Sequence, residues 1–234
     1  MPPSAPTLFL FDIDGTLLST SGSGYRSFTR SCKETLGIVD QVEGINMAGK
    51  LDRMIFQEIA GRYRPELAGE ELAGRWLRFK ASYIRYLQRA SRNPRGWKLM
   101  PGVEELVRYS SEQGKLALLT GNVRDGALIK LTAFGLADYF PIGGFGEDNV
   151  TRDELAEQAF RIACSHYRVE FSRERTFVFG DTTHDIRAAR AIQAKSVGVA
   201  TGTVSAEDLA RAGADLLVSD FLSGAEAVRR FISQ

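Results

Sequence analysis

The sequence predicts an α/β fold, in which helices cover an open parallel sheet, on the strength of two patterns. The first is a set of short, continuously apolar runs bounded by turn residues, at 7–11, 116–119, 176–179, 196–200 and 216–218. Such runs are typical of strands that are buried on both faces of a sheet. The second pattern is helical periodicity between the runs. Regular alternation of strand and helix favours parallel strands joined by right-handed crossovers.

The helices between the strands are predicted from apolar residues that recur on one helix face. These positions are Val103, Leu106 and Val107; Leu128, Leu131 and Phe134; and Leu155, Ala159, Ile162 and Ala163. Gly114 and Gly135 follow the first two sets, and glycine is a common helix terminator.

Residues 19–97 interrupt the alternation, because they contain helical periodicity and no convincing strand. The apolar faces are Tyr25, Phe28, Cys32 and Leu36; Ile55 and Ile59; and Leu72, Trp76, Phe79, Tyr83 and Leu87. Aromatic residues at helical spacing usually form a core, and residues 92–96 have the composition of a return linker. We therefore predict a smaller helical domain at 19–97, inserted after the first strand, and an α/β core formed by residues 1–18 and 98–234.

Composition and charge exclude some classes of function. The 234 residues include 30 Lys plus Arg against 29 Asp plus Glu, for a net charge of +1. This balance provides no basic field for a nucleic-acid backbone, so no nucleic-acid partner is expected. A local cluster of positive groups could still bind a small anion.

The cysteines and the N-terminus indicate an intracellular protein. Cys32 and Cys164 stand in no metal-ligand or redox spacing, so we interpret both as buried thiols. The N-terminus has no basic start, and Asp12 and Asp14 cut its apolar run short. It therefore resembles neither a signal peptide nor a membrane span. We expect a soluble, cytoplasmic protein without a membrane partner.

Polar residues follow three of the five predicted strands. They are Asp12 and Asp14, Thr120 and Asn122, and Asp181 and Asp185. Ligands of open parallel sheets bind beyond the carboxyl ends of the strands. Four carboxylates gathered there would resist ionisation unless a cation neutralised them, and Mg²⁺ suits both oxygen ligands and a phosphate substrate. The alternative is that these aspartates only cap the helices that follow.

The same residues are suited to phosphoryl transfer. A carboxylate can attack phosphorus once positive groups neutralise the phosphoryl oxygens. A second carboxyl group two residues away could protonate the leaving oxygen and later activate water. Thr120 and the following amides could hold phosphoryl oxygens, and a cationic side chain is still needed to stabilise the transition state.

Three motifs resemble those of the haloacid dehalogenase (HAD) superfamily, in the right order and each after a predicted strand. They are DIDGTL at 12–17, LTGN at 119–122 and GDTTHD at 180–185. The resemblance covers essentially the whole chain and is greatest to the phosphoglycolate phosphatase-like branch. It implies a Rossmann-like open parallel sheet, with residues 19–97 as the family's helical cap.

The resemblance also implies catalytic and metal-binding roles. Asp12 would be the nucleophile and Asp14 the general acid/base. Mg²⁺ would be held by the Asp12 carboxylate, the Asp14 backbone carbonyl and the Asp181 carboxylate, with Asp185 binding it directly or through water.

Substrate contacts are implied in the same way. Thr120, Gly121 and Asn122 would position the phosphoryl group. Thr16 would also bind the substrate, and it would support the turn that carries Asp14.

The cation of the third motif is a departure from the family's pattern, which usually supplies a lysine. Between Gly121 and Gly180 the only lysine is Lys130, which we interpret as poorly placed in the helix after the second motif. Thr151 and Glu154 have the spacing of a capping box, which puts Arg152 in the first turn of a helix. Related sequences can use arginine here, so we assign the role to Arg152; the alternative is a solvent-exposed surface arginine.

Lys50 is the one candidate substrate contact in the helical segment. It lies in residues 47–52, which resemble the loop that reaches toward the substrate in this branch. Lys50 could bind a substrate anion, or it could be an ordinary exposed lysine.

The resulting hypothesis is a Mg²⁺-dependent phosphatase that acts through an aspartyl-phosphate on a small phosphorylated metabolite. Its substrate would be phosphoglycolate-like, or a sugar or nucleotide phosphate. A dehalogenase is disfavoured because it has no leaving oxygen for Asp14 to protonate. A phosphomutase shares all the motifs and stays open. A non-catalytic ligand-binding protein is disfavoured because both Asp12 and Asp14 are present.

Overall fold

The computed structural model describes residues 6–39, 42, 44–147 and 151–234. Residues 1–5 and 148–150 of the predicted core, and 40, 41 and 43 of the predicted insert, lie outside the described residues.

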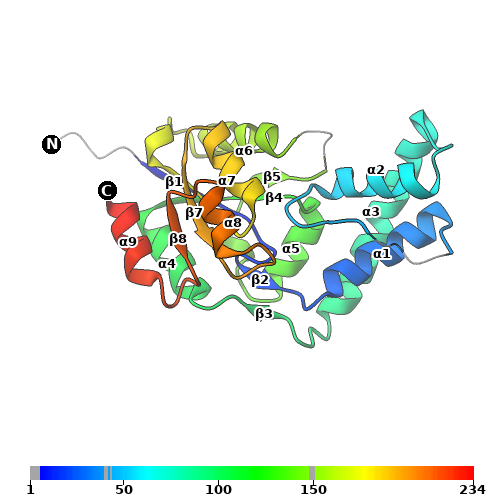
Figure 1. Ribbon diagram of the computed structural model, residues 1–234, viewed down its shortest axis with the longest axis horizontal. Helices are drawn as coiled ribbons and strands as arrows, with labels where there is room; N and C mark the ends of the chain where they lie inside the picture. Colours follow the sequence, from blue (N-terminus) through cyan, green and yellow to red (C-terminus); the bar gives the residue numbers. More distant parts are fainter. Residues whose placement is uncertain (1–5, 40–41, 43, 148–150) are drawn as a thin grey trace.

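The described residues form a parallel sheet of six strands in the order β5-β4-β1-β6-β7-β8 (Figure 1). The strands are β1 (Thr7–Phe11), β4 (Gly114–Thr120), β5 (Gly143–Phe145), β6 (Thr176–Gly180), β7 (Lys195–Val199) and β8 (Leu216–Val218). The predicted α/β parallel sheet is therefore confirmed. Strand β5 was not predicted, because its sequence GGF lacks an apolar run.

The central strand β1 shows why its sequence is continuously apolar. All five residues of TLFLF are buried. Phe9 and Phe11 belong to the hydrophobic cluster on one face of the sheet, whereas Leu8 and Leu10 belong to the cluster on the other. A strand with two buried faces favours apolar side chains, and its one polar residue, Thr7, accepts a hydrogen bond from Arg175 Nη2 at 2.7 Å. Phe11 also stacks on Phe179 of β6, with ring centroids 4.5 Å apart.

Helices cover both faces of the sheet (Figure 1). They are α4 (Val103–Gln113), α5 (Arg124–Thr132), α6 (Arg152–Tyr167), α7 (Thr183–Ala191), α8 (Ala206–Arg211) and α9 (Ala225–Ser233), with short 3-10 turns η1 (Ala137–Tyr139) and η2 (Arg173–Arg175). Helices α4, α5 and α9 contribute to the cluster around Phe9 and Phe11, and helices α6 and α7 to the cluster around Leu8 and Leu10. Gly114 follows the last residue of α4, as predicted, and is also the first residue of β4.

The three remaining helices lie to one side of the sheet (Figure 1). They are α1 (Ser23–Leu36), α2 (Asp52–Tyr63) and α3 (Gly69–Ser91). Their apolar faces meet in a separate hydrophobic cluster, in which Phe79 packs against Phe28, Phe56, Trp76 and Tyr83. This packing favours the predicted core and insert, whose exact division stays a prediction. We call residues 19–97 the helical insert.

The chain enters and leaves the helical insert through one short antiparallel pair. Strand β2 (Leu18–Ser19) pairs with β3 (Lys98–Leu99). Apart from Ser19 at its first position, the described residues of the insert form no strand. The two crossings of the chain therefore lie side by side.

The helical insert contacts the core at the start of α2. The Asp52 backbone N–H donates to the Gly121 carbonyl at 2.8 Å, and that of Arg53 donates to the Gly146 carbonyl at 3.1 Å. A Cβ atom on Gly121 would lie 2.2 Å from the Lys50 carbonyl oxygen, so only glycine permits this approach.

None of the helices in the described part of the chain is long and apolar enough to cross a membrane.

Candidate active site

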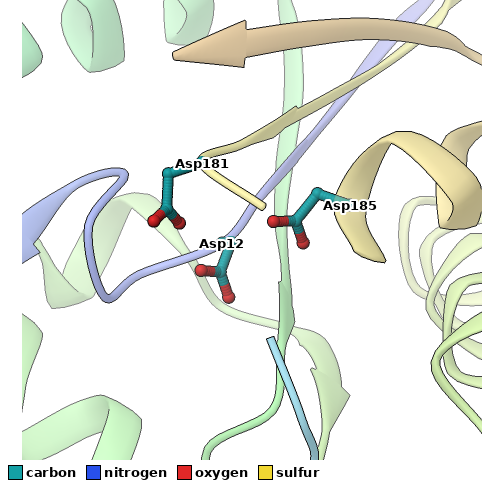
Figure 2. A group of neighbouring side chains, drawn as sticks. All are labelled: Asp12, Asp181 and Asp185. Atoms are coloured by element: carbon teal, nitrogen blue, oxygen red, sulfur yellow. The ribbon is translucent and has the colours of Figure 1, made fainter. Parts of the chain in front are cut away.

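Three aspartates meet at the carboxyl edge of the sheet. Asp12 follows β1, Asp181 follows β6, and Asp185 lies in the first turn of α7. Figure 2 shows their carboxyl groups close together at this edge. One oxygen from each lies within 4.8 Å of the others, and all three residues are buried. Parallel neighbouring strands bring these groups together, as the sequence predicts.

Burial and mutual repulsion perturb these carboxyl groups strongly. Burial raises the pKa of Asp12 to about 7, the charge of Asp185 adds to the rise, and Arg152 opposes it. Burial and the charges of Asp12 and Asp185 raise the pKa of Asp181 to about 8, against a hydrogen bond from Thr16. Such a set is more easily ionised with a cation among the oxygens.

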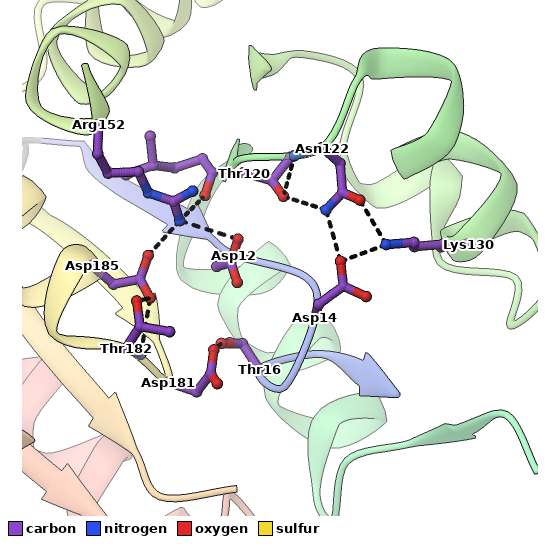
Figure 3. Close-up of polar contacts among 11 residues, drawn as sticks. Asp12, Asp14, Thr16, Thr120, Asn122, Lys130, Arg152, Asp181, Thr182 and Asp185 are labelled. Carbon is purple, nitrogen blue, oxygen red and sulfur yellow. Dashed lines mark hydrogen bonds and ion pairs between the residues drawn. The ribbon is translucent and has the colours of Figure 1, made fainter. Parts of the chain in front are cut away.

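Arg152 is the cation of this group. It is the first residue of α6, after a Thr151–Glu154 capping box, so the predicted local structure is confirmed. Its side chain is 7% exposed, which excludes the alternative of a solvent-exposed arginine. Its Nη2 donates to Asp12 Oδ1 at 3.1 Å, to the Leu119 carbonyl at 3.2 Å and to Asp185 Oδ1 (Figure 3).

The charges around Arg152 keep it protonated. Burial alone would lower the pKa of the guanidinium, but the charges of Asp185 and Asp12 outweigh burial and raise the pKa above its usual value. Arg152 is therefore a fixed positive charge beside the predicted nucleophile.

Asp185 has two roles in the structure. Its Oδ1 accepts from Arg152, whereas its Oδ2 accepts from the Thr182 backbone N–H at 3.1 Å and from the Thr182 hydroxyl at 2.7 Å. The helix-capping alternative thus holds for one oxygen of Asp185. The other oxygen belongs to the charged cluster.

A second polar network surrounds Asp14. Asn122 Nδ2 donates to Asp14 Oδ2 and to the Thr120 hydroxyl oxygen, each at 2.8 Å. Lys130 Nζ donates to Asn122 Oδ1 at 2.6 Å and to Asp14 Oδ2 (Figure 3). Lys130 is only 4% exposed at its side chain, whereas Asp14 is 44% exposed. The network therefore fixes Asp14 Oδ2 through hydrogen bonds from Asn122 and Lys130.

Lys130 is the residue that our sequence reasoning missed as part of this site. We took Leu128, Leu131 and Phe134 as the apolar face of the helix. In the structure the buried residues of α5 are Gly126, Ala127, Lys130 and Leu131. A lysine on the buried face of a short helix is the signal that could have identified it, because lysine is almost never fully buried without a partner.

The other predicted site residues lie close by. Thr16 is fully buried, and its hydroxyl donates to Asp181 Oδ1 at 3.2 Å. This hydrogen bond connects the turn after β1 to the residue that follows β6. Gly121 lines the cavity described below, as does Lys50. The ammonium of Lys50 pairs with Glu58 Oε2 at 2.5 Å, so its contact with a substrate anion stays a prediction.

A cavity of about 470 Å³ opens above the aspartates, between the sheet edge and the helical insert. This volume is in the range of small-molecule sites. Core residues on its wall include Asp12, Asp14, Asn122, Arg152 and Asp181. The insert contributes Tyr25, Phe28, Met47, Asp52, Ile55 and Tyr83, among others. Both parts of the chain would therefore contact a ligand.

The donor set fits a hard divalent cation. Three buried carboxylates within 4.8 Å of one another match the oxygen ligands of Mg²⁺ or Ca²⁺ rather than the nitrogen and sulfur ligands of softer metals. Asp12, Asp181 and Asp185 could supply side-chain oxygens, and the Asp14 backbone carbonyl could add another.

Known proteins resemble this chain over almost its full length. A phosphoglycolate phosphatase of Nitrosococcus oceani is 24% identical over 98% of this chain and 97% of its own. The crystal structure of a hydrolase from Pseudomonas syringae has a TM-score of 0.68 and 22% identity, and covers 96% of this chain and 98% of that chain. A β-phosphoglucomutase from Clostridium difficile has a TM-score of 0.69 and 17% identity over 97% of each chain.

The family model of the haloacid dehalogenase-like hydrolases matches residues 9–199. This range contains all three motifs and every predicted site residue. The family, the α/β fold and a phosphatase-type enzyme are thereby confirmed. The chain belongs to the haloacid dehalogenase-like hydrolase family.

Proposed function

We propose that this enzyme hydrolyses a small phosphomonoester with the help of Mg²⁺, through a phosphorylated Asp12. The observation that carries the proposal is the placement of the buried Asp12 carboxylate between Arg152 and the carboxylates of Asp181 and Asp185. A nucleophile for phosphorus needs this combination of a carboxylate and fixed positive charge. The relative named phosphoglycolate phosphatase supports the same reaction class.

The metal site is proposed from the same cluster. Asp12, Asp181 and Asp185, with the Asp14 carbonyl, would hold Mg²⁺. When bound, the ion neutralises the clustered carboxylates and phosphoryl oxygens. Thr16 keeps Asp181 in place through its hydroxyl.

The first chemical step is assigned to Asp12 and Arg152. An Asp12 oxygen attacks phosphorus as the bond from phosphorus to the ester oxygen breaks. Arg152 is held by Asp185 and the Leu119 carbonyl, so its guanidinium is already oriented before substrate binds. Preorganised charge of this kind stabilises a transition state without reorganisation during the reaction.

The proton transfers are assigned to Asp14. Its carboxyl group would protonate the departing ester oxygen and then take a proton from the water that hydrolyses the aspartyl-phosphate. Asn122 and Lys130 both donate to Oδ2, which leaves Oδ1 as the oxygen that transfers protons. Lys130 is therefore proposed as a positioning residue for Asp14.

Thr120 would contact the phosphoryl group through its hydroxyl proton. The oxygen of this hydroxyl accepts two hydrogen bonds, one from Asn122 Nδ2 and one from the Asn122 backbone N–H. A hydroxyl also carries one proton to donate, and a phosphoryl oxygen beside Asp12 is a suitable acceptor. Gly121 and Asn122 contribute the neighbouring wall of the site.

The test is phosphate release from a panel of phosphomonoesters by purified protein, with Mg²⁺ or with a chelator. Wild type should release phosphate only with the metal, and Asp12→Asn should release none above background. Asp125→Asn, a matched change at an exposed residue of α5, is the control for purification and folding. Equal release by wild type and Asp12→Asn would refute the proposal.

The same experiment separates the alternatives. A phosphomutase would move the phosphoryl group to a second hydroxyl of the substrate and release little phosphate. A dehalogenase would release halide from a 2-haloacid instead. A ligand-binding protein would do neither but would still bind a phosphomonoester.

A further inference from the structure

The cations that line the cavity are all engaged by carboxylates of the protein. The described wall contains three of them, Lys50, Lys130 and Arg152. Arg152 pairs with Asp12 and Asp185, and Lys130 with Asp14. Both therefore belong to the phosphoryl end. Lys50, on the insert side, pairs with Glu58 of α2 at 2.5 Å.

The wall that faces a leaving group is apolar over much of its area. Phe28, Ile55 and Tyr83 are nearly fully buried residues of the insert and reach the cavity from three different helices. Tyr25 and Met47 continue this surface. A carboxylate or a second phosphate placed against it would lose water without gaining a cationic partner, which is unfavourable.

The acidic residue on this wall opposes an anionic leaving group as well. Asp52 lines the cavity, is 7% exposed and accepts a hydrogen bond from the Val123 backbone N–H at 2.9 Å. Burial raises the pKa of its carboxyl group to about 7, against the opposing charge of Lys130. As a neutral acid Asp52 could donate to a hydroxyl, and as an anion it would repel a negative group.

From these contacts we propose that the substrate is a phosphomonoester whose organic part is uncharged. This inference rests on the proposed phosphatase function and narrows it. It excludes phosphoglycolate, in which a carboxylate lies next to the ester, and pyrophosphate as preferred substrates. The walls fit an apolar or hydroxyl-bearing group instead.

The decisive comparison uses two substrates that differ mainly in charge, phosphoglycolate and its neutral amide, 2-phosphoglycolamide. Wild type should hydrolyse the amide with a kcat/KM at least about tenfold higher than the acid. Butyl and benzyl phosphate extend the neutral series, and pyrophosphate extends the charged one. Both neutral esters should be better substrates than pyrophosphate.

Variants at Lys50, the one insert cation among the described residues of this wall, test whether missing positive charge causes the preference. Glu58→Gln removes the partner of Lys50, so it should raise kcat/KM for phosphoglycolate relative to the amide. Glu58→Gln combined with Lys50→Met should return the ratio to the wild-type value. Met47→Lys adds a cation to the wall and should, like Glu58→Gln alone, raise kcat/KM for phosphoglycolate relative to the amide. The uncharged control Met47→Gln should leave this ratio unchanged.

The outcomes distinguish this inference from the function beneath it. Asp12-dependent hydrolysis that favours phosphoglycolate over its amide would overturn the inference and leave the phosphatase function intact. An unchanged ratio in both Glu58→Gln and Met47→Lys would also overturn it. Failure of every phosphomonoester to give Asp12-dependent phosphate would overturn the proposed function, and this inference with it.

Discussion

The carboxyl edge of the sheet and the interior of the helical insert bury opposite kinds of side chain. At the sheet edge, Arg152, Asp12 and Asp185 are buried charges in direct contact. In the insert the buried groups are aromatic rings, with Phe79 stacked on Trp76 and Tyr83. The sheet edge thus gathers buried charges, and the insert gathers buried apolar surface.

The ion pairs of the two regions also differ in what they contribute. In the insert Arg85 and Glu34 pair at the surface, with side chains 60% and 43% exposed, and such pairs add little to stability. Arg152 and Asp185 are 7% and 1% exposed, so each would be costly to leave without its partner. Charge is structural as well as chemical at the sheet edge, whereas in the insert it is mainly solvated.

The largest predicted effect is at Arg152. Arg152→Met should lower kcat/KM by about 10³-fold, because a preorganised charge beside the transferred phosphoryl group is lost. Arg152→Lys should recover part of this activity, since it keeps the charge but not the planar fork. Steady-state kinetics on a neutral phosphomonoester measures both.

The control for Arg152 is Arg161→Met on the same helix, where the side chain is 76% exposed. It should leave kcat/KM unchanged. If Arg152→Met were as active as Arg161→Met, the cation of the reaction would have to be another residue.

The next effect concerns Lys130 and depends on the leaving group. Lys130→Met should slow hydrolysis of an alkyl phosphate by about 10²-fold, because Asp14 is no longer held to protonate the alkoxide. It should slow p-nitrophenyl phosphate far less, since nitrophenolate leaves without a proton. The ratio of the two kcat values is the measurement.

Asp14→Asn is the reference for Lys130→Met and should show the same selectivity. An equal loss of activity on both substrates would mean that Lys130 only maintains the fold. In that case the proposed positioning role would be wrong.

In the aromatic interior of the insert we expect a stability effect without a chemical one. Phe79→Leu should lower the free energy of unfolding by about 1–2 kcal/mol, because buried ring contacts are lost. The kcat on a small neutral phosphomonoester should stay within about twofold of wild type, because the ring contacts of Phe79 are with aromatic residues of the insert. Denaturant titration and kinetics on one preparation test this contrast. A large fall in kcat at unchanged stability would contradict the assignment of a purely structural role to this part of the insert.

The last effect is a pH-dependent stability effect at Asp52, where the two regions meet. Its folded pKa of about 7 is above the reference value of 3.8, so the folded state holds this proton more tightly than the unfolded state. The contribution to stability is therefore present at low pH and is lost as pH rises from about 4 to about 7.

Asp52→Asn removes this titration and keeps an acceptor for the Val123 N–H. Between pH 4 and 7 the variant should gain stability relative to wild type by up to about 4 kcal/mol, since each unit of pKa difference corresponds to about 1.4 kcal/mol. The free energy of unfolding measured at several pH values checks this. Parallel pH profiles for the two proteins would show that Asp52 titrates normally.

Much of the sheet and of its catalytic edge could be predicted from local sequence. Strands with two buried faces are continuously apolar, which identified β1, β4, β6, β7 and β8 and the polar residues that follow the first three of these. Arg152 was predicted from its capping box, because Thr151 and Glu154 fix the start of α6. Strand β5 escaped because two of its three residues are glycine.

Lys130 and Asp52 could not be assigned in this way. Lys130 contacts Asp14 across 116 positions of the chain, and Asp52 contacts Val123 across 71. Each is an ordinary charged residue in its local sequence, and only its distant partner gives it a role. Their contacts depend on how α5 packs beneath the helical insert.

The sequence by itself determined the family, the parallel sheet and the carboxylates at the carboxyl edge of that sheet. It could do so because neighbouring parallel strands bring their carboxyl ends together in any fold of this kind. Only the tertiary structure decided that Lys130 forms an ion pair with Asp14 and that Lys50 forms one with Glu58. It also decided that an apolar wall lines the cavity, because that wall is assembled from three helices and exists only once they pack over the sheet.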